Sequence, residues 1–132
     1  MEKRTLLLAE DDADDQQFFL DFLQGHSDLA LLPVAENGEV LLEHLNRLTE
    51  SADLPHYIIL DQNMPRMNGL QTLQALKSDS RYAHIPVMIY STYTNEALEK
   101  EGMARGACLV LPKPFTKAGY EQLIQSFIRA CS

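Results

Sequence analysis

An aspartate at the end of an apolar run has the clearest chemical potential in this chain. Asp61 closes the run that begins at Tyr57, and Pro65 and Gly69 follow it closely in YIILDQNMPRMNG. Such a run is typical of a strand in a parallel sheet covered on both faces, and ligands bind these sheets at the carboxyl ends of the strands. We therefore expect Asp61 to face a crevice and to be the centre of function.

Two further carboxylates follow an earlier apolar run, in LLLAEDD. If Glu10 and Asp11 adjoin Asp61, each like-charged pair about 4 Å apart costs on the order of 4 kcal/mol at an effective dielectric constant near 20. A cation could offset that repulsion. Hard oxygen ligands suit Mg²⁺, which usually shares its shell with water and substrate phosphate. These carboxylates therefore predict a magnesium site.

A hydroxyl pair and an ammonium group follow two other apolar runs. Ser91 and Thr92 come after VMIY, and Lys113 stands between Pro112 and Pro114 in LPKPF. Taken singly, such hydroxyls usually form a turn or a helix cap, and most lysines are solvated. Together with the carboxylates they form a set that could bind Mg²⁺ and three phosphoryl oxygens around a nucleophilic carboxylate.

The elements that must position these groups are five apolar runs separated by segments of helical periodicity. The predicted strands lie at about 5–9, 29–35, 56–61, 86–91 and 107–111. The alternation of strand and helix with short loops implies right-handed crossovers. The fold class is therefore α/β, a doubly wound parallel sheet of five strands with five helices.

The predicted helices differ in how clear their apolar faces are. The first, at about 13–25, ends at Gly25, and the last spans about 116–130. The apolar stripe of the first consists of Phe18, Phe19, Phe22 and Leu23. The acids Asp12, Asp14 and Asp15 are expected to cap this helix and complement its dipole. The fourth helix, at about 95–105, is weaker, and its expected apolar contacts are Ala97, Leu98 and Met103.

The composition limits the number of domains and the classes of binding partner that this chain can have. A chain of 132 residues with 45% hydrophobic content suits one domain, expected to span 1–132 with no output domain. The net charge of −8 disfavours direct binding to nucleic acid or anionic membranes. Cys108, expected in a buried strand, and Cys131 lack metal-binding spacing and are interpreted as reduced thiols. With no apolar segment long enough for a signal peptide or membrane span, we expect a cytoplasmic protein.

The whole chain resembles the receiver domain of two-component response regulators, of the stand-alone, chemotaxis-regulator-like type. The resemblance rests on EDD after the first strand, DQNMPRMNG, ST after the fourth strand and KPF after the fifth. It implies the flavodoxin-like strand order 2-1-3-4-5. It also implies a phosphoacceptor rather than an enzyme, with a histidine kinase or histidine phosphotransfer protein as donor and an unknown protein as target. The domain is expected to be a monomer or a weak homodimer.

The resemblance also implies a role for each site residue. Asp61 would accept the phosphoryl group. Mg²⁺ would be held by Glu10, Asp11, Asp61 and the backbone carbonyl of Asn63. The phosphoryl oxygens would be contacted by Ser91, Thr92 and Lys113. A cis peptide bond is implied between Lys113 and Pro114.

One position departs from the family pattern. Many receivers carry an aromatic residue three positions before the lysine, and its rotamer follows the state of the hydroxyl. This chain has Val110 there, which leaves the readout mechanism open. Tyr93, two residues after Ser91, is hypothesised to screen the acyl phosphate from water.

Alternatives from other functional classes remain. An Mg²⁺-dependent phosphatase with an aspartate nucleophile also uses a strand-end acid, but it usually has a second acid two residues later, where this chain has Asn63. A phosphorylation-independent interaction domain would be expected to have lost site residues, and none of them is missing from this sequence. A flavin site is disfavoured by electrostatics, because a flavin phosphate requires backbone donors and hydroxyls after the first strand, where this chain has Glu10, Asp11 and Asp12.

Overall fold

The computed structural model describes residues 3–24 and 28–131. Five parallel strands form one sheet in the order β2-β1-β3-β4-β5. The strands are β1 (Arg4–Ala9), β2 (Leu29–Leu31), β3 (Tyr57–Asp61), β4 (Val87–Ser91) and β5 (Leu109–Pro112). The predicted fold class and strand order are confirmed.

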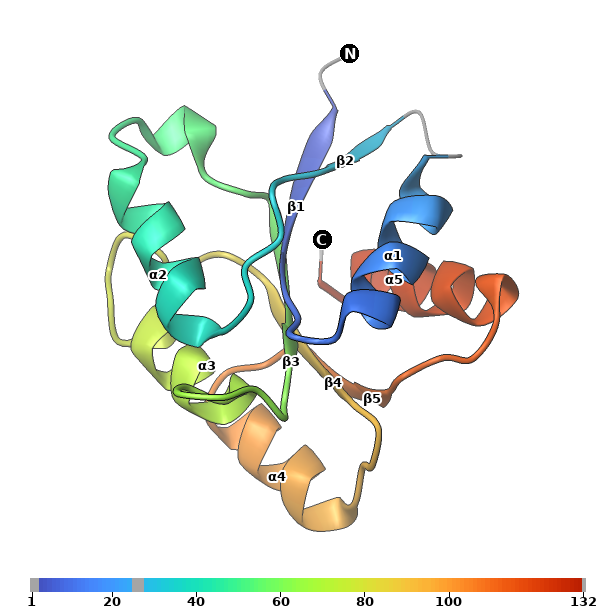
Figure 1. The fold of residues 1–132 in the computed structure, drawn as a ribbon. Helices are drawn as coiled ribbons and strands as arrows, with labels where there is room; N and C mark the ends of the chain where they lie inside the picture. The colour runs from blue at the N-terminus through green and yellow to red at the C-terminus, as the bar shows by residue number, and fades with distance from the viewer. Residues whose placement is uncertain (1–2, 25–27, 132) are drawn as a thin grey trace.

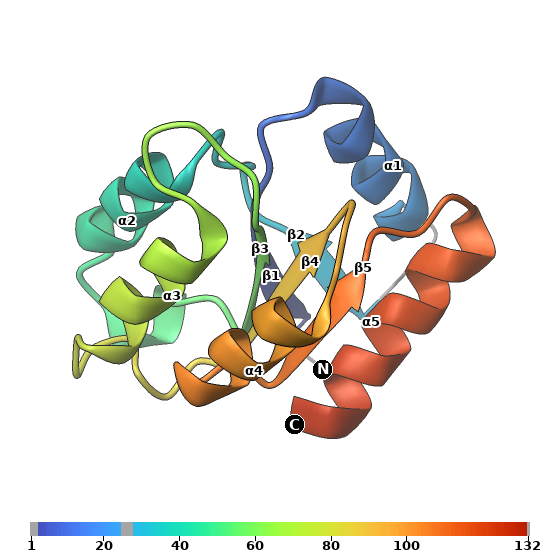
Figure 2. The ribbon, with the colours of Figure 1, turned by 90° about the horizontal axis from the view of Figure 1, so that it is seen from below.

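Helices cover both faces of the sheet (Figures 1 and 2). They are α1 (Ala13–Leu23), α2 (Gly38–Arg47), α3 (Gly69–Lys77), α4 (Glu96–Ala104) and α5 (Lys117–Cys131). Figure 1 shows α2, α3 and α4 on one side of the sheet and α1 and α5 on the other. A short 3-10 helix, Ser51–Asp53, precedes β3.

The alternation of side chains along the central strands explains why both faces need a cover. In β3, Ile58 and Leu60 pack toward α2 and α3, while Tyr57 and Ile59 pack toward α1 and α5. All of β3 is buried. A strand that is apolar on both faces is stable only between two layers of helices.

Side-chain caps define where several helices begin. Asp12 accepts a hydrogen bond from the Asp15 backbone N–H at the start of α1. The side chains of Asn37, Asn68 and Asn95 accept the equivalent bonds at α2, α3 and α4. The expected cap at Asp12 is therefore present.

The edge strand β2 is shorter than predicted. It ends at Leu31, and Ala35 rejoins the sheet only through a single bridge to Ala9. Pro33, which has no backbone N–H to donate to a ladder, lies between them. The first helix ends at Leu23, and the predicted stop at Gly25 lies outside the described residues.

Two expected apolar faces were partly wrong. Phe18 is 50% exposed and its ring lies tilted against that of Tyr120, with 6.0 Å between centroids, whereas the rest of its predicted stripe is buried. In α4, Ala97 and Met103 are exposed and Leu98 is half-buried. The buried residue of α4 is Gly102, where an added Cβ would lie 2.7 Å from Val110 Cγ2. A close backbone approach to β5, rather than an apolar stripe, holds this helix.

The structure also tests the predicted position of Cys108 and the predicted lack of a membrane span. Cys108 directly precedes β5 and is half-buried rather than within a buried strand. No helix in 3–24 or 28–131 has the length and apolar character that crossing a membrane requires.

Candidate functional site

The register of the sheet brings the strand-end residues together. Ala9 pairs with Leu60, so Glu10 lies beside Asp61 at the same edge. Asp61 pairs with Tyr90, and Ser91 pairs with Pro112, which precedes Lys113. Parallel strands end at one edge, so residues more than 100 positions apart in sequence meet there.

An acidic cluster forms the floor of this edge. Glu10 and Asp61 are 0% and 2% exposed, whereas Asp11 is exposed. One carboxylate oxygen from each of the three residues lies within 4.8 Å of the others. Such a set of hard oxygen donors, open to solvent at Asp11, could hold a divalent cation such as Mg²⁺.

Lys113 supplies the positive charge at this cluster. Its Nζ lies 3.0 Å from Glu10 Oε1, 2.9 Å from Asp15 Oδ2 and 3.3 Å from Asp61 Oδ1. Burial opposes its charge, but the bonds to Asp15 and Glu10 and the charges of Glu10 and Asp61 raise the pKa of Lys113 overall. The ammonium group is therefore held charged against three carboxylates.

The pKa of Asp61 differs from that of an ordinary surface aspartate. Burial, followed by the charge of Glu10, raises its pKa from 3.8 to about 8, against the opposing effect of Lys113. A buried carboxylate beside another carboxylate favours its neutral form unless a cation joins the site. The site therefore favours ligands that bring positive charge.

The loop after β3 is held close to Asp61. The Asn63 backbone N–H donates to Asp61 Oδ1 at 3.3 Å, and Asn63 Nδ2 donates to Ser91 Oγ at 3.4 Å. Gly69 permits this return, because a Cβ there would lie 2.8 Å from the backbone oxygen of Asp61. The predicted residues Asn63 and Ser91 thus share one small network with Asp61.

The other predicted site residues differ in how far they are buried. Ser91 is buried, whereas Thr92 is exposed, and Tyr93 is 82% exposed. Val110 is buried in the layer under α4. The Lys113–Pro114 bond is trans, so the expected cis bond is wrong for this structure. Trans is the more stable isomer even before proline, and Lys113 reaches the carboxylates with it.

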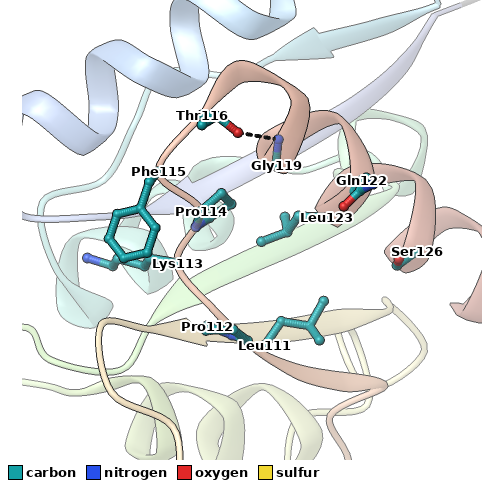
Figure 3. Close-up of a pocket in the computed structure, with 10 residues that line it drawn as sticks. All are labelled: Leu111, Pro112, Lys113, Pro114, Phe115, Thr116, Gly119, Gln122, Leu123 and Ser126. Carbon is teal, nitrogen blue, oxygen red and sulfur yellow. Dashed lines mark hydrogen bonds between the residues drawn. The ribbon is translucent and has the colours of Figure 1, made fainter.

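A groove of about 470 Å³ lies beside the site, between the end of β5 and the start of α5. Figure 3 shows the connecting segment 113–116, with Lys113 and Phe115 on one side of it and Leu123 and Gln122 of α5 on the other. The Thr116 hydroxyl accepts from the Gly119 N–H at 3.0 Å and so caps α5. Phe115 is 96% exposed.

Sequence reasoning missed two residues of the site. Asp15, expected only to complement the dipole of α1, pairs with Lys113 across 98 positions of sequence. Tyr90 is fully buried, and its hydroxyl donates a hydrogen bond to Glu10 Oε1. Tyr90 packs on the face of the sheet that α1 and α5 cover, and the register that pairs it with Asp61 brings its hydroxyl to Glu10.

Comparison with known proteins identifies the family. Residues 6–125 match the family described as the response regulator receiver domain. The chain is 34% identical over 116 residues to a protein-glutamate methylesterase/protein-glutamine glutaminase of Geobacillus kaustophilus, covering 86% of this chain but 31% of that protein. It therefore spans about a third of that relative's length.

Two chemotaxis proteins are also similar. The chain is 35% identical over 82 residues to chemotaxis protein CheY1 of Helicobacter pylori, covering 62% of this chain and 63% of that protein. The structure of Vibrio cholerae CheY4 matches with a TM-score of 0.81 and 26% identity, covering 95% of this chain and 98% of that one. Because the family match runs from β1 into α5, over the edge where the acids and Lys113 meet, the chain belongs to the receiver domains of two-component response regulators.

Proposed function

We propose that this protein is a phosphorylation-controlled switch in which Asp61 accepts a phosphoryl group from a phosphohistidine. The donor is a histidine kinase or a histidine phosphotransfer protein. A carboxylate oxygen of Asp61 attacks phosphorus, the bond from phosphorus to the histidine nitrogen breaks, and that nitrogen keeps the electron pair. The buried Asp61 in contact with Lys113 is the observation that carries this proposal.

Other residues are proposed to bind and orient the phosphoryl group. Mg²⁺ would be held by Glu10, Asp11, Asp61 and the backbone carbonyl of Asn63, and it would neutralise charge on the transferring group. Ser91 and Lys113 would contact the phosphoryl oxygens, with Thr92 at the rim. Lys113 would exchange part of its contact with the carboxylates for contact with the phosphoryl group, which shifts the loop after β5.

The phosphorylated form is proposed to bind a partner protein differently from the unphosphorylated form. The new acceptor oxygens draw the loops that carry Ser91 and Lys113 inward, so the surface of α4, β5 and α5 changes. The hydrolase alternative is less well supported, because Asn63 takes the position of its second acid and its amide contacts Ser91.

The test is incubation of the protein with Mg²⁺ and acetyl phosphate, followed by measurement of the intact mass. The wild type should gain one phosphoryl group, and Asp61→Asn should gain none. Asp14→Asn, which changes an exposed acid in the first turn of α1, is the matched control and should still be modified. An adduct that persists in Asp61→Asn, or no adduct in the wild type, would count against the proposal.

A second expectation concerns the lifetime of the acyl phosphate. Tyr93 is exposed two residues after Ser91, where its ring could shield the phosphoryl group from water. Tyr93→Ala should lose the phosphoryl group several-fold faster than the wild type, and Tyr93→Phe should keep the wild-type rate. The rate is measured by intact mass after the phosphodonor is removed. A Tyr93→Ala rate equal to the wild-type rate would sink the shielding role.

A further inference from the structure

Tyr90 brings a hydroxyl into the interior directly beneath the acidic cluster. The side chain is 0% exposed and lies in β4 opposite Asp61. Its ring packs edge-on against Phe19 at 5.6 Å between centroids, and Lys113 Nζ lies 5.1 Å from its centre. The ring is therefore held from two sides, and its hydroxyl donates to Glu10 Oε1.

The hydrogen bonds of Glu10 leave few free acceptor positions. Oε1 accepts from Tyr90 and contacts Lys113 Nζ at 3.0 Å, while Oε2 accepts from the Asp12 backbone N–H at 3.1 Å. Each carboxylate oxygen has two lone pairs. Oε1 is thus fully used, and one lone pair of Oε2 remains for a cation shared with Asp11 and Asp61.

We propose that Tyr90 is a positioning residue that fixes the orientation of Glu10 and thereby raises the affinity of the acidic cluster for Mg²⁺. This inference rests on the proposed function, because it assigns that cluster to Mg²⁺. Without the hydroxyl, Oε1 would have a free lone pair, and the carboxylate could turn toward Lys113 or toward the cation with either oxygen. Donors that hold a ligating carboxylate in place usually matter nearly as much as the ligands themselves.

The ring of Tyr90 also serves as core packing, so the test must separate the hydroxyl from the ring. Tyr90→Phe keeps the ring against Phe19 and removes only the hydroxyl. Tyr82→Phe is the matched control, because Tyr82 is also buried and its hydroxyl donates to Asn46 Oδ1 at 2.8 Å, in the layer under α2 and α3. Both variants lose one hydroxyl and one hydrogen bond.

The measurement is metal binding without any phosphodonor. Mn²⁺ binding is followed by electron paramagnetic resonance, and Mg²⁺ is then added as a competitor. Tyr90→Phe is expected to weaken both affinities by about ten- to a hundredfold, the usual range for a lost outer-shell partner. Tyr82→Phe should keep the wild-type affinity. In a Glu10→Gln background, Tyr90→Phe should have no further effect, because Tyr90 acts through Glu10.

The outcomes separate this inference from the proposed function. Wild-type affinity in Tyr90→Phe, or an equal loss in Tyr82→Phe, overturns the role of Tyr90 and leaves phosphorylation of Asp61 intact. Absence of metal binding in the wild type overturns both. If Tyr90→Phe fails to fold by circular dichroism, 3-fluorotyrosine at position 90 provides a stronger donor of the same shape. Its affinity should then exceed that of the wild type, and an unchanged value overturns the inference.

Discussion

Replacement of Lys113 by methionine is expected to destabilise the metal-free protein by about 3–5 kcal/mol at pH 8, the range for a buried ion pair that loses one partner. The Lys113 side chain is only 12% exposed, and its contacts supply positive charge to Asp15, Glu10 and Asp61. Methionine keeps the length and the apolar stem but not the charge. At pH 5 the loss should be smaller, because Asp61, with its pKa raised to about 8, then carries a proton.

Urea unfolding at pH 5 and pH 8 measures both values. Lys100→Met is the matched control, since Lys100 pairs with Glu96 at 3.6 Å while both side chains are exposed, at 77% and 83%. Exposed pairs contribute roughly 0–1 kcal/mol, so this variant should unfold almost as the wild type does. Equal losses in the two variants, or a greater loss for Lys113→Met at pH 5, would contradict the assigned role of the ammonium group.

The second expected result is an unusual pH dependence of the metal-free protein. Relative to Asp61→Asn, the wild type should lose stability as the pH rises from about 4 to about 8. The pKa of Asp61 is 3.8 when unperturbed and about 8 in the folded protein, so the native state binds the proton more tightly. Rising pH removes that advantage by at most about 1.4 kcal/mol per pH unit for one group.

The measurement is the melting temperature of both proteins from pH 5 to pH 8 in the presence of a chelator. Asp61→Asn should be the more stable of the two at pH 8, since it places no second negative charge beside Glu10. Saturating Mg²⁺ should raise the wild-type melting temperature most at pH 8, where about half of the Asp61 side chains have already lost the proton that competes with the cation. Asp11→Ala should abolish that rise. Parallel pH profiles for wild type and Asp61→Asn would show that Asp61 titrates normally.

Much of this site could be predicted because the fold places all strand ends at one edge. The apolar runs located Asp61, Glu10 and Ser91 without any contact information, and the alternation of strand and helix was enough for the fold class. Strand order required the family resemblance, because periodicity describes each strand alone.

Partnerships across the sheet could not be predicted from local patterns. Asp15 sits in the first turn of α1, where an acid is favourable without any tertiary contact, so nothing nearby indicated Lys113. Tyr90 is one of several large side chains in buried strands, and only the register opposite Asp61 makes it a neighbour of Glu10. The exposure of Phe18 likewise depends on how α1 meets α5.

The close contact between Gly102 of α4 and Val110 of β5 limits which side chains position 110 can accept from other receiver domains. Grafting a tyrosine onto position 110 alone would force a larger ring into a seam where even a methyl group on Gly102 would lie 2.7 Å from the valine. Overfilled seams of this kind usually cost about 1–3 kcal/mol and displace the backbone. An aromatic residue at position 110 would therefore require a matching α4, so α4 and β5 would have to be exchanged together.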